Sequence, residues 1–141
     1  FSLGDIEKGK WNFVKDPDYC YIGSSPTVPH KLKTGQSRGD TYILVYTINR
    51  NPEAIVQIEA GYPYNTSKII EVKIDSSSYK FKSQDETPET AWTEKDDEII
   101  YAMKKGAELK VIGISKKGTK TIDTYTLKGF TAAFNKLKEN C

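Results

Sequence analysis

Hydrophobic and polar side chains alternate with a period of two along several short stretches of the chain. In residues 70–74, isoleucine and valine face one side, while Glu71 and Lys73 face the other. Residues 54–60 alternate in the same way, and residues 41–48 are apolar on both faces, as in a central strand. Further strands are predicted at residues 11–14, 19–22, 79–82, 109–114 and 119–126. Half-buried strands at such short spacing are typical of a β-sandwich or a barrel.

Two segments instead show the spacing of an amphipathic helix. Near residues 94–105, apolar side chains form one stripe between an acidic first turn and a basic last turn that ends at Gly106. Near residues 128–139, Phe130, Phe134 and Leu137 share one face. We therefore predict an all-β fold, a β-sandwich or partly open barrel, with these two helices and one domain over residues 1–141.

Two segments are predicted to be loops. Residues 23–39 are rich in Ser, Pro, Gly and Lys, and residues 83–89 are acidic and contain a proline. A loop longer than about 12 residues is often a binding segment or simply mobile, and mobility is the favoured interpretation for the first of them.

Charge and hydropathy exclude some partners. The formal net charge of +2 is too balanced to predict nucleic-acid binding. No apolar run approaches the roughly 20 residues of a membrane-spanning helix, so no transmembrane segment is expected.

The chain has two cysteines, Cys20 and Cys141, and nothing near either supplies a partner for a metal. We predict a disulfide between them; two free thiols, or pairing with another molecule, are the alternatives. The sequence starts at Phe1, as an exported protein would after its signal peptide was removed, although a trimmed cytosolic protein would begin in the same way.

Candidate catalytic groups are few. Nucleophilic catalysis needs a hydroxyl or thiol beside a base, and the sole imidazole is His30. A group of Ser24, Ser25 and His30 is conceivable, but a solvated loop histidine is the preferred interpretation. We predict no catalytic residues, no metal site and no cofactor.

Tyrosine is the one compositional sign of binding, since the chain has nine. A buried phenol needs a partner for its hydroxyl, so all nine are not expected in the core. Tyr62 and Tyr64 flank Pro63 and are the pair most expected to be exposed. With His30, they are the candidate partner-binding residues.

The order of these features resembles the invasion-associated locus B (IalB) family of bacterial exported proteins. The most specific feature is the end of the chain, where a strand runs into Leu-Lys-Gly-Phe-Thr-Ala-Ala at residues 127–133. The other features are Trp11, the strand Cys20-Tyr21-Ile22, Ile74-Asp75 and the apolar helix that ends at Gly106. The family commonly has a further cysteine pair in the region of residues 81–92, which this chain lacks.

The resemblance implies a periplasmic or secreted all-β domain, linked in some bacteria to host-cell invasion or to the cell envelope, with no established catalytic activity. The functional hypothesis is a non-enzymatic exported protein that binds a protein or glycan of the envelope or of a host. The alternative is a small hydrolase or lyase that acts on a cell-wall or sugar substrate through the loop at residues 23–39.

Overall fold

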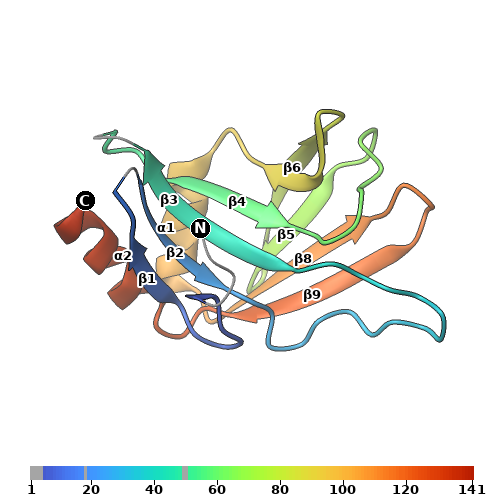
Figure 1. Ribbon diagram of the computed structural model, residues 1–141, viewed down its shortest axis with the longest axis horizontal. Helices are drawn as coiled ribbons and strands as arrows, with labels where there is room; N and C mark the ends of the chain where they lie inside the picture. The colour runs from blue at the N-terminus through green and yellow to red at the C-terminus, as the bar shows by residue number, and fades with distance from the viewer. Residues whose placement is uncertain (1–4, 18, 49–50) are drawn as a thin grey trace.

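Figure 1 shows the computed structural model of the chain, which describes residues 5–17, 19–48 and 51–141. Phe1, from which export was inferred, lies outside these residues. The described elements, in chain order, are β1 (Asn12–Lys15), β2 (Tyr19–Ser24), β3 (Tyr42–Ile48), β4 (Ile55–Glu59), β5 (Ile70–Ile74), β6 (Ser77–Gln84), β7 (Thr87–Trp92), α1 (Asp96–Lys105), β8 (Glu108–Ile114), β9 (Lys120–Thr126) and α2 (Phe130–Asn140).

The strands form one antiparallel sheet in the order β1-β2-β3-β4-β7-β6-β5-β8-β9. The sheet curls until its two edges approach each other (Figure 1). Val28, which follows β2, pairs with Thr124 of β9, and the indole N–H of Trp11 donates to the Thr126 carbonyl over 2.8 Å. The prediction of an all-β fold of the sandwich or partly open barrel type is confirmed.

Both helices lie toward one end of the curled sheet, and the β8–β9 hairpin lies at the other (Figure 1). The helix predicted near residues 94–105 is α1, and the C-terminal helix predicted near residues 128–139 is α2. Their apolar faces are buried as expected: Ile99, Ile100 and Met103 in α1, and Phe130, Ala133, Phe134 and Leu137 in α2. Trp11 packs edge-on against Phe130, with 5.0 Å between the ring centroids. The helical end of the molecule is therefore a dense aromatic and aliphatic core.

The prediction of a loop at residues 83–89 is wrong, because these residues complete the β6–β7 hairpin around a turn at Asp85 and Glu86. Pro88 stands in β7, where its missing N–H would ordinarily weaken a central strand. The β6–β7 ladder shifts its register between Lys82 and Gln84, near this proline. The Pro88 carbonyl accepts the Tyr64 N–H over 2.8 Å, so the strand is held from the other side.

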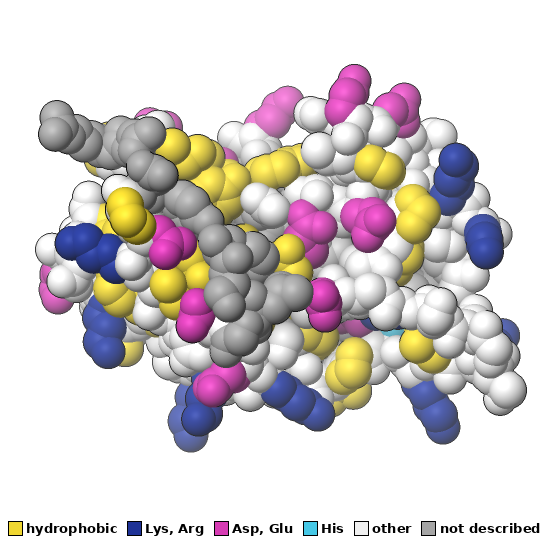
Figure 2. All heavy atoms as spheres, viewed as in Figure 1, with side chains coloured by type: hydrophobic (Ala, Val, Ile, Leu, Met, Phe, Trp, Pro, Cys, Tyr) yellow, Lys and Arg dark blue, Asp and Glu magenta, His cyan; other side chains and the backbone are white. Residues whose placement is uncertain are grey.

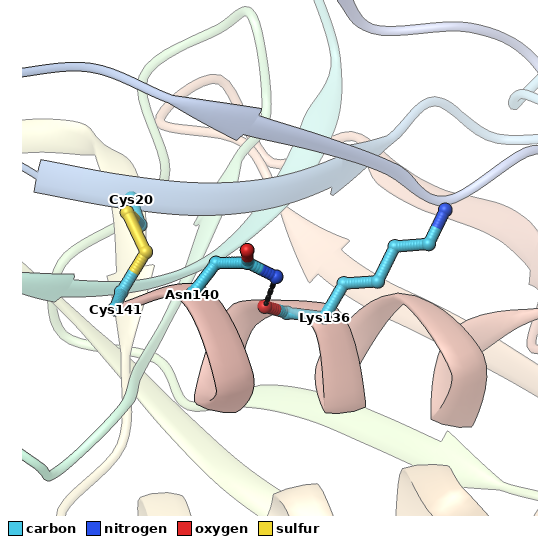
Figure 3. The surroundings of a disulfide bond; sticks show 4 residues. All are labelled: Cys20, Lys136, Asn140 and Cys141. Carbon is cyan, nitrogen blue, oxygen red and sulfur yellow. Dashed lines mark hydrogen bonds between the residues drawn. A yellow bond between two sulfur atoms is a disulfide. The ribbon is translucent and has the colours of Figure 1, made fainter.

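The predicted disulfide between Cys20 and Cys141 is present and ties the end of α2 to β2 (Figure 3). Their Cα atoms are 6.4 Å apart, and the two residues are separated by 121 positions in the sequence. Beside the bridge, the Asn140 side chain donates to the Lys136 carbonyl over 2.8 Å and closes the last turn of the helix (Figure 3).

Removal of this bridge should lower the free energy of unfolding by about 4 kcal/mol, because the crosslink closes a very long loop in the unfolded chain. Cys141→Ser is the cleaner substitution, since Cys141 is exposed, whereas Cys20 is buried. Urea denaturation of Cys141→Ser and of reduced wild type measures the loss, and the two should agree. Reduction should also add two hydrogens to the intact mass; an unchanged mass contradicts the bridge.

Candidate functional site

The segment between β2 and β3 is held against β9. The N–H and C=O of Val28 bond the C=O and N–H of Thr124, over 3.1 and 2.9 Å, and the Thr27 hydroxyl donates to the same carbonyl. After His30 the segment leaves β9, with residues 31–37 exposed, and returns at Arg38. The segment predicted as a mobile or binding loop is thus held to the sheet at both ends, and residues 31–37 form an exposed free stretch between them.

Asp123 bonds both ends of this segment, at His30 and at Arg38. Its side chain faces inward on β9 and is only 3% exposed, and it accepts the His30 backbone N–H over 2.9 Å. Arg38 donates to both carboxylate oxygens, over 2.7 and 2.6 Å, and its third contact runs from Nε to the Ala60 carbonyl over 2.7 Å. Such a planar two-bond contact is the strongest geometry available to an arginine and a carboxylate.

The electrostatics of Arg38 follow from this contact. Burial lowers the pKa of Arg38, but the hydrogen bond to Asp123 and the charge of that carboxylate outweigh the effect, so the pKa is raised above its usual value. The guanidinium therefore stays charged, and it is already paired. It also lies over the Tyr62 ring, with its central carbon 5.0 Å from the ring centroid.

Two glycines permit the close packing of this end. Gly61 has φ +77, and a Cβ there would lie 2.4 Å from the Gly39 carbonyl oxygen. The two residues instead bond directly, with Gly39 N–H donating to Gly61 O over 2.8 Å. On β8, a Cβ on Gly113 would lie 2.6 Å from the Tyr62 hydroxyl. The absence of a side chain at Gly113 therefore leaves room for the Tyr62 phenol, which shares a 2.5 Å hydrogen bond with the Thr121 hydroxyl.

A cleft of about 620 Å³ opens between the free stretch of the segment, the Gly61–Pro63 turn and the β8–β9 hairpin. It is of the size of small-molecule and cofactor sites. Its lining combines an aliphatic side chain, a phenol, an imidazole, basic groups and one acid: Leu32, Tyr62, His30, Arg38, Lys116, Lys117 and Glu89. Such a lining offers apolar contact and hydrogen bonds together.

Of the three predicted partner-binding residues, two lie at the cleft, and the third is buried against one of them. His30 and Tyr62 both line the cleft. The expectation that Tyr64 is exposed is wrong, because its side chain is only 2% exposed and its ring meets Tyr62 edge-on at 5.3 Å. Its N–H is bonded to Pro88, and the following residue, Asn65, donates to the Ile114 carbonyl. Burial raises the pKa of the Tyr64 phenol.

The Ser24, Ser25 and His30 group is not assembled as a nucleophile and base. Ser24 is fully buried, and its hydroxyl lies 3.5 Å from the carbonyl oxygens of Glu7 and Ser25. His30 Nδ1 instead accepts the backbone N–H of Ile122 over 3.3 Å. Within residues 5–17, 19–48 and 51–141, no three His, Cys, Asp or Glu side chains gather closely enough to hold a metal ion.

Both the sequence and the fold of this chain are similar to those of known proteins. The sequence profile of the invasion associated locus B (IalB) protein family matches residues 19–138. The chain belongs to the IalB family. It is also similar to the crystal structure of invasion associated protein B from Bartonella henselae, with 14% sequence identity, a TM-score of 0.64 and 92% of each chain covered. At this identity, the likeness shows a shared fold. No curated protein sequence matches the chain.

In the part of this IalB-family chain that the structure describes, neither helix is long and apolar enough to cross a bilayer.

Sequence reasoning missed Arg38, Asp123 and Thr121 at the cleft. One signal was available: in the alternating strand at residues 120–126, Asp123 falls on the inward face between Thr121 and Tyr125. A carboxylate on an inward face demands a buried partner.

Arg38→Met should destabilise the protein by about 3–5 kcal/mol, because it leaves the Asp123 carboxylate buried without its cation. The double variant Arg38→Met with Asp123→Asn should be less destabilised than the sum of the two single variants, since it removes both charges. Urea denaturation measures all three.

Lys110→Met is the matched control, because Lys110 belongs to an ion pair with Glu108 in which both side chains are about half exposed. Its loss should cost at most about 1 kcal/mol. Strict additivity of the two substitutions at Arg38 and Asp123 would show that the pair is not energetically coupled.

Proposed function

We propose that this IalB-family protein acts outside the cytoplasm, in the periplasm or after secretion, by binding a protein or glycan partner in the cleft between the loop and the β8–β9 hairpin. The cleft itself carries the proposal. It is built on a buried ion pair, and it presents Leu32, Tyr62 and His30 to solvent-accessible space. The role is non-enzymatic.

Export is supported by the disulfide and by the family. Disulfides form and persist in oxidising compartments such as the bacterial periplasm, and are rare in the cytosol. The similar Bartonella henselae protein is described as invasion associated, which favours a partner in the cell envelope or on a host.

Binding is favoured over catalysis by the state of the polar groups at the cleft. The Arg38 guanidinium is paired with Asp123, the Tyr62 hydroxyl is bonded to Thr121, and His30 Nδ1 holds a backbone N–H. Groups engaged in this way shape a surface and hold it in place. A hydrolase or lyase that relied on Ser24, Ser25 and His30 gains no support from this geometry.

The test is capture of partners from the envelope fraction of the producing cell on immobilised protein, with recovered proteins and glycans identified by mass spectrometry. Leu32→Glu places a charge at the mouth of the cleft, where Leu32 is 42% exposed, without disturbing the core. It should reduce the recovery of the partner about tenfold, as expected when an apolar contact of about 1.4 kcal/mol is lost.

Ile48→Glu is the control, since Ile48 is similarly exposed, at 46%, and does not line the cleft. It should capture the partner as wild type does. Equal recovery by all three proteins would contradict the proposal, as would recovery of no protein or glycan above the background of the bare support.

A further inference from the structure

The outer edge of β9 carries backbone groups that are free to bond. In an antiparallel strand, the N–H and C=O of one residue point toward one neighbour and those of the next residue toward the other. Since Thr124 bonds Val28, its backbone groups point away from β8, and the period of two gives Ile122 and Lys120 the same direction. The bond from Ser115 N–H to the Thr119 carbonyl agrees, because it places odd-numbered residues toward β8.

The preceding loop covers only part of this edge. Val28 pairs with Thr124, and the His30 ring takes the Ile122 N–H, after which the chain turns away. Among the described residues, no group bonds the Ile122 carbonyl or the N–H and C=O of Lys120. The loop thus forms the beginning of an additional strand beside β9 and leaves the rest of that position open, alongside the cleft that Thr119 and Thr121 line.

The outer face of the sheet next to this open edge is apolar. Ile122 is 40% exposed and lies directly opposite Ile112 of β8. A shallow groove of about 440 Å³ continues from there, lined by Ile69, Ile112, Ile114, Lys80 and Lys120. A strand added to β9 would direct alternate side chains over this face and the others into the cleft beside Thr121.

The charges around the edge are mostly positive. Lys116 and Lys117 stand at the cleft, and Lys120 and Lys80 border the groove. In the view of Figure 2, Lys and Arg side chains project along the lower and right-hand margins of the molecule, and acidic side chains lie at the upper margin, across the middle and toward the lower left. The carboxylates that line the two hollows are Glu89 and Glu71, and Glu71 accepts the Ser78 hydroxyl.

We propose that an extended peptide segment of the partner, with aliphatic and acidic side chains, adds to β9 as a strand at Lys120–Ile122. This inference rests on the proposed function and names the class of partner. Free amide and carbonyl groups at strand spacing match a peptide backbone, as in other proteins that bind by strand addition. A second copy of this chain fits poorly, because pairing two β9 edges antiparallel would bring their lysines together.

The test uses a probe obtained by selecting a random peptide library on phage against the wild-type protein, followed by synthesis of the enriched peptide. Lys120→Pro removes the free N–H. Proline is tolerated there because Lys120 is the first residue of an edge strand and its N–H does not serve β8. Affinity for the peptide should fall more than about tenfold below that of Lys120→Ala, since a peptide acceptor is left unpaired.

Lys120→Ala is the matched control, because it removes the charge and keeps the N–H. It should weaken binding at most about fivefold. The thermal midpoint and circular dichroism of both variants establish that they are folded. As a second measurement on wild-type protein, methylating alternate backbone nitrogens of the peptide should abolish binding in one register and preserve it in the other, because only one set of N–H groups faces β9.

Four results would overturn the inference: no enriched peptide, equal affinity of Lys120→Pro and Lys120→Ala, indifference to methylation in both registers, or a wild-type dimer that Lys120→Pro dissolves. The envelope capture separates this inference from the function on which it rests. A partner whose recovery is lost with Leu32→Glu but kept with Lys120→Pro would support binding in the cleft and contradict strand addition to β9. A partner recovered equally well with Leu32→Glu would contradict the proposal that the cleft is the binding site.

Discussion

The contact between Arg38 and Asp123 is the interaction on which the open end of this molecule depends. Burying two charges is costly, and the cost is offset only where geometry is good and the remaining polar groups are satisfied. Here the guanidinium meets both carboxylate oxygens, its Nε reaches Ala60, and the carboxylate takes the His30 N–H as well. One buried pair thereby joins the loop, the end of β4 and β9.

Between His30 and Arg38, the chain pairs with no strand among the residues that the structure describes, and this explains the cleft. The loop is anchored at Val28 and His30, is exposed through residues 31–37, and is anchored again at Arg38 and Gly39. The hollow beside β9 is therefore a consequence of how the sheet closes. The opposite end of the molecule is closed by α1, α2, the Trp11 contact and the disulfide, so different interactions hold the two ends.

Side-chain periodicity was enough to find most of the fold. The period of two located the strands from β1 to β6 and the last two strands, and the stripes in α1 and α2 located the helices within a few residues. It failed at β7, where Pro88 and a run of polar residues imitate a loop. That strand exists because its hairpin neighbour β6 on one side, and β4 and the Tyr64 N–H on the other, supply its partners. Of these, β4 and Tyr64 are distant in sequence, so the local pattern of residues did not reveal them.

The site was harder to find than the fold. His30 and Tyr62 were identified from residue type alone, and both line the cleft, but the same reasoning placed Tyr64 outside, where it is not. Residue type does not tell which of two tyrosines in one turn meets solvent. That depends on Gly113, whose missing side chain admits the rings, and on Pro88, which bonds the Tyr64 backbone.

The sequence by itself determined the elements other than β7 and indicated the family, and it predicted the pairing of the two cysteines that the structure then showed, since each depends on short-range pattern or on the residue types present. Only the tertiary structure decided that Arg38 and Asp123 meet across 85 residues, that the loop stops short along β9, and that the strand edge at Lys120 stays open. The physical reason is that ion pairs, close backbone contacts and unfilled strand positions are relations between distant segments. They come into being only when the sheet has closed.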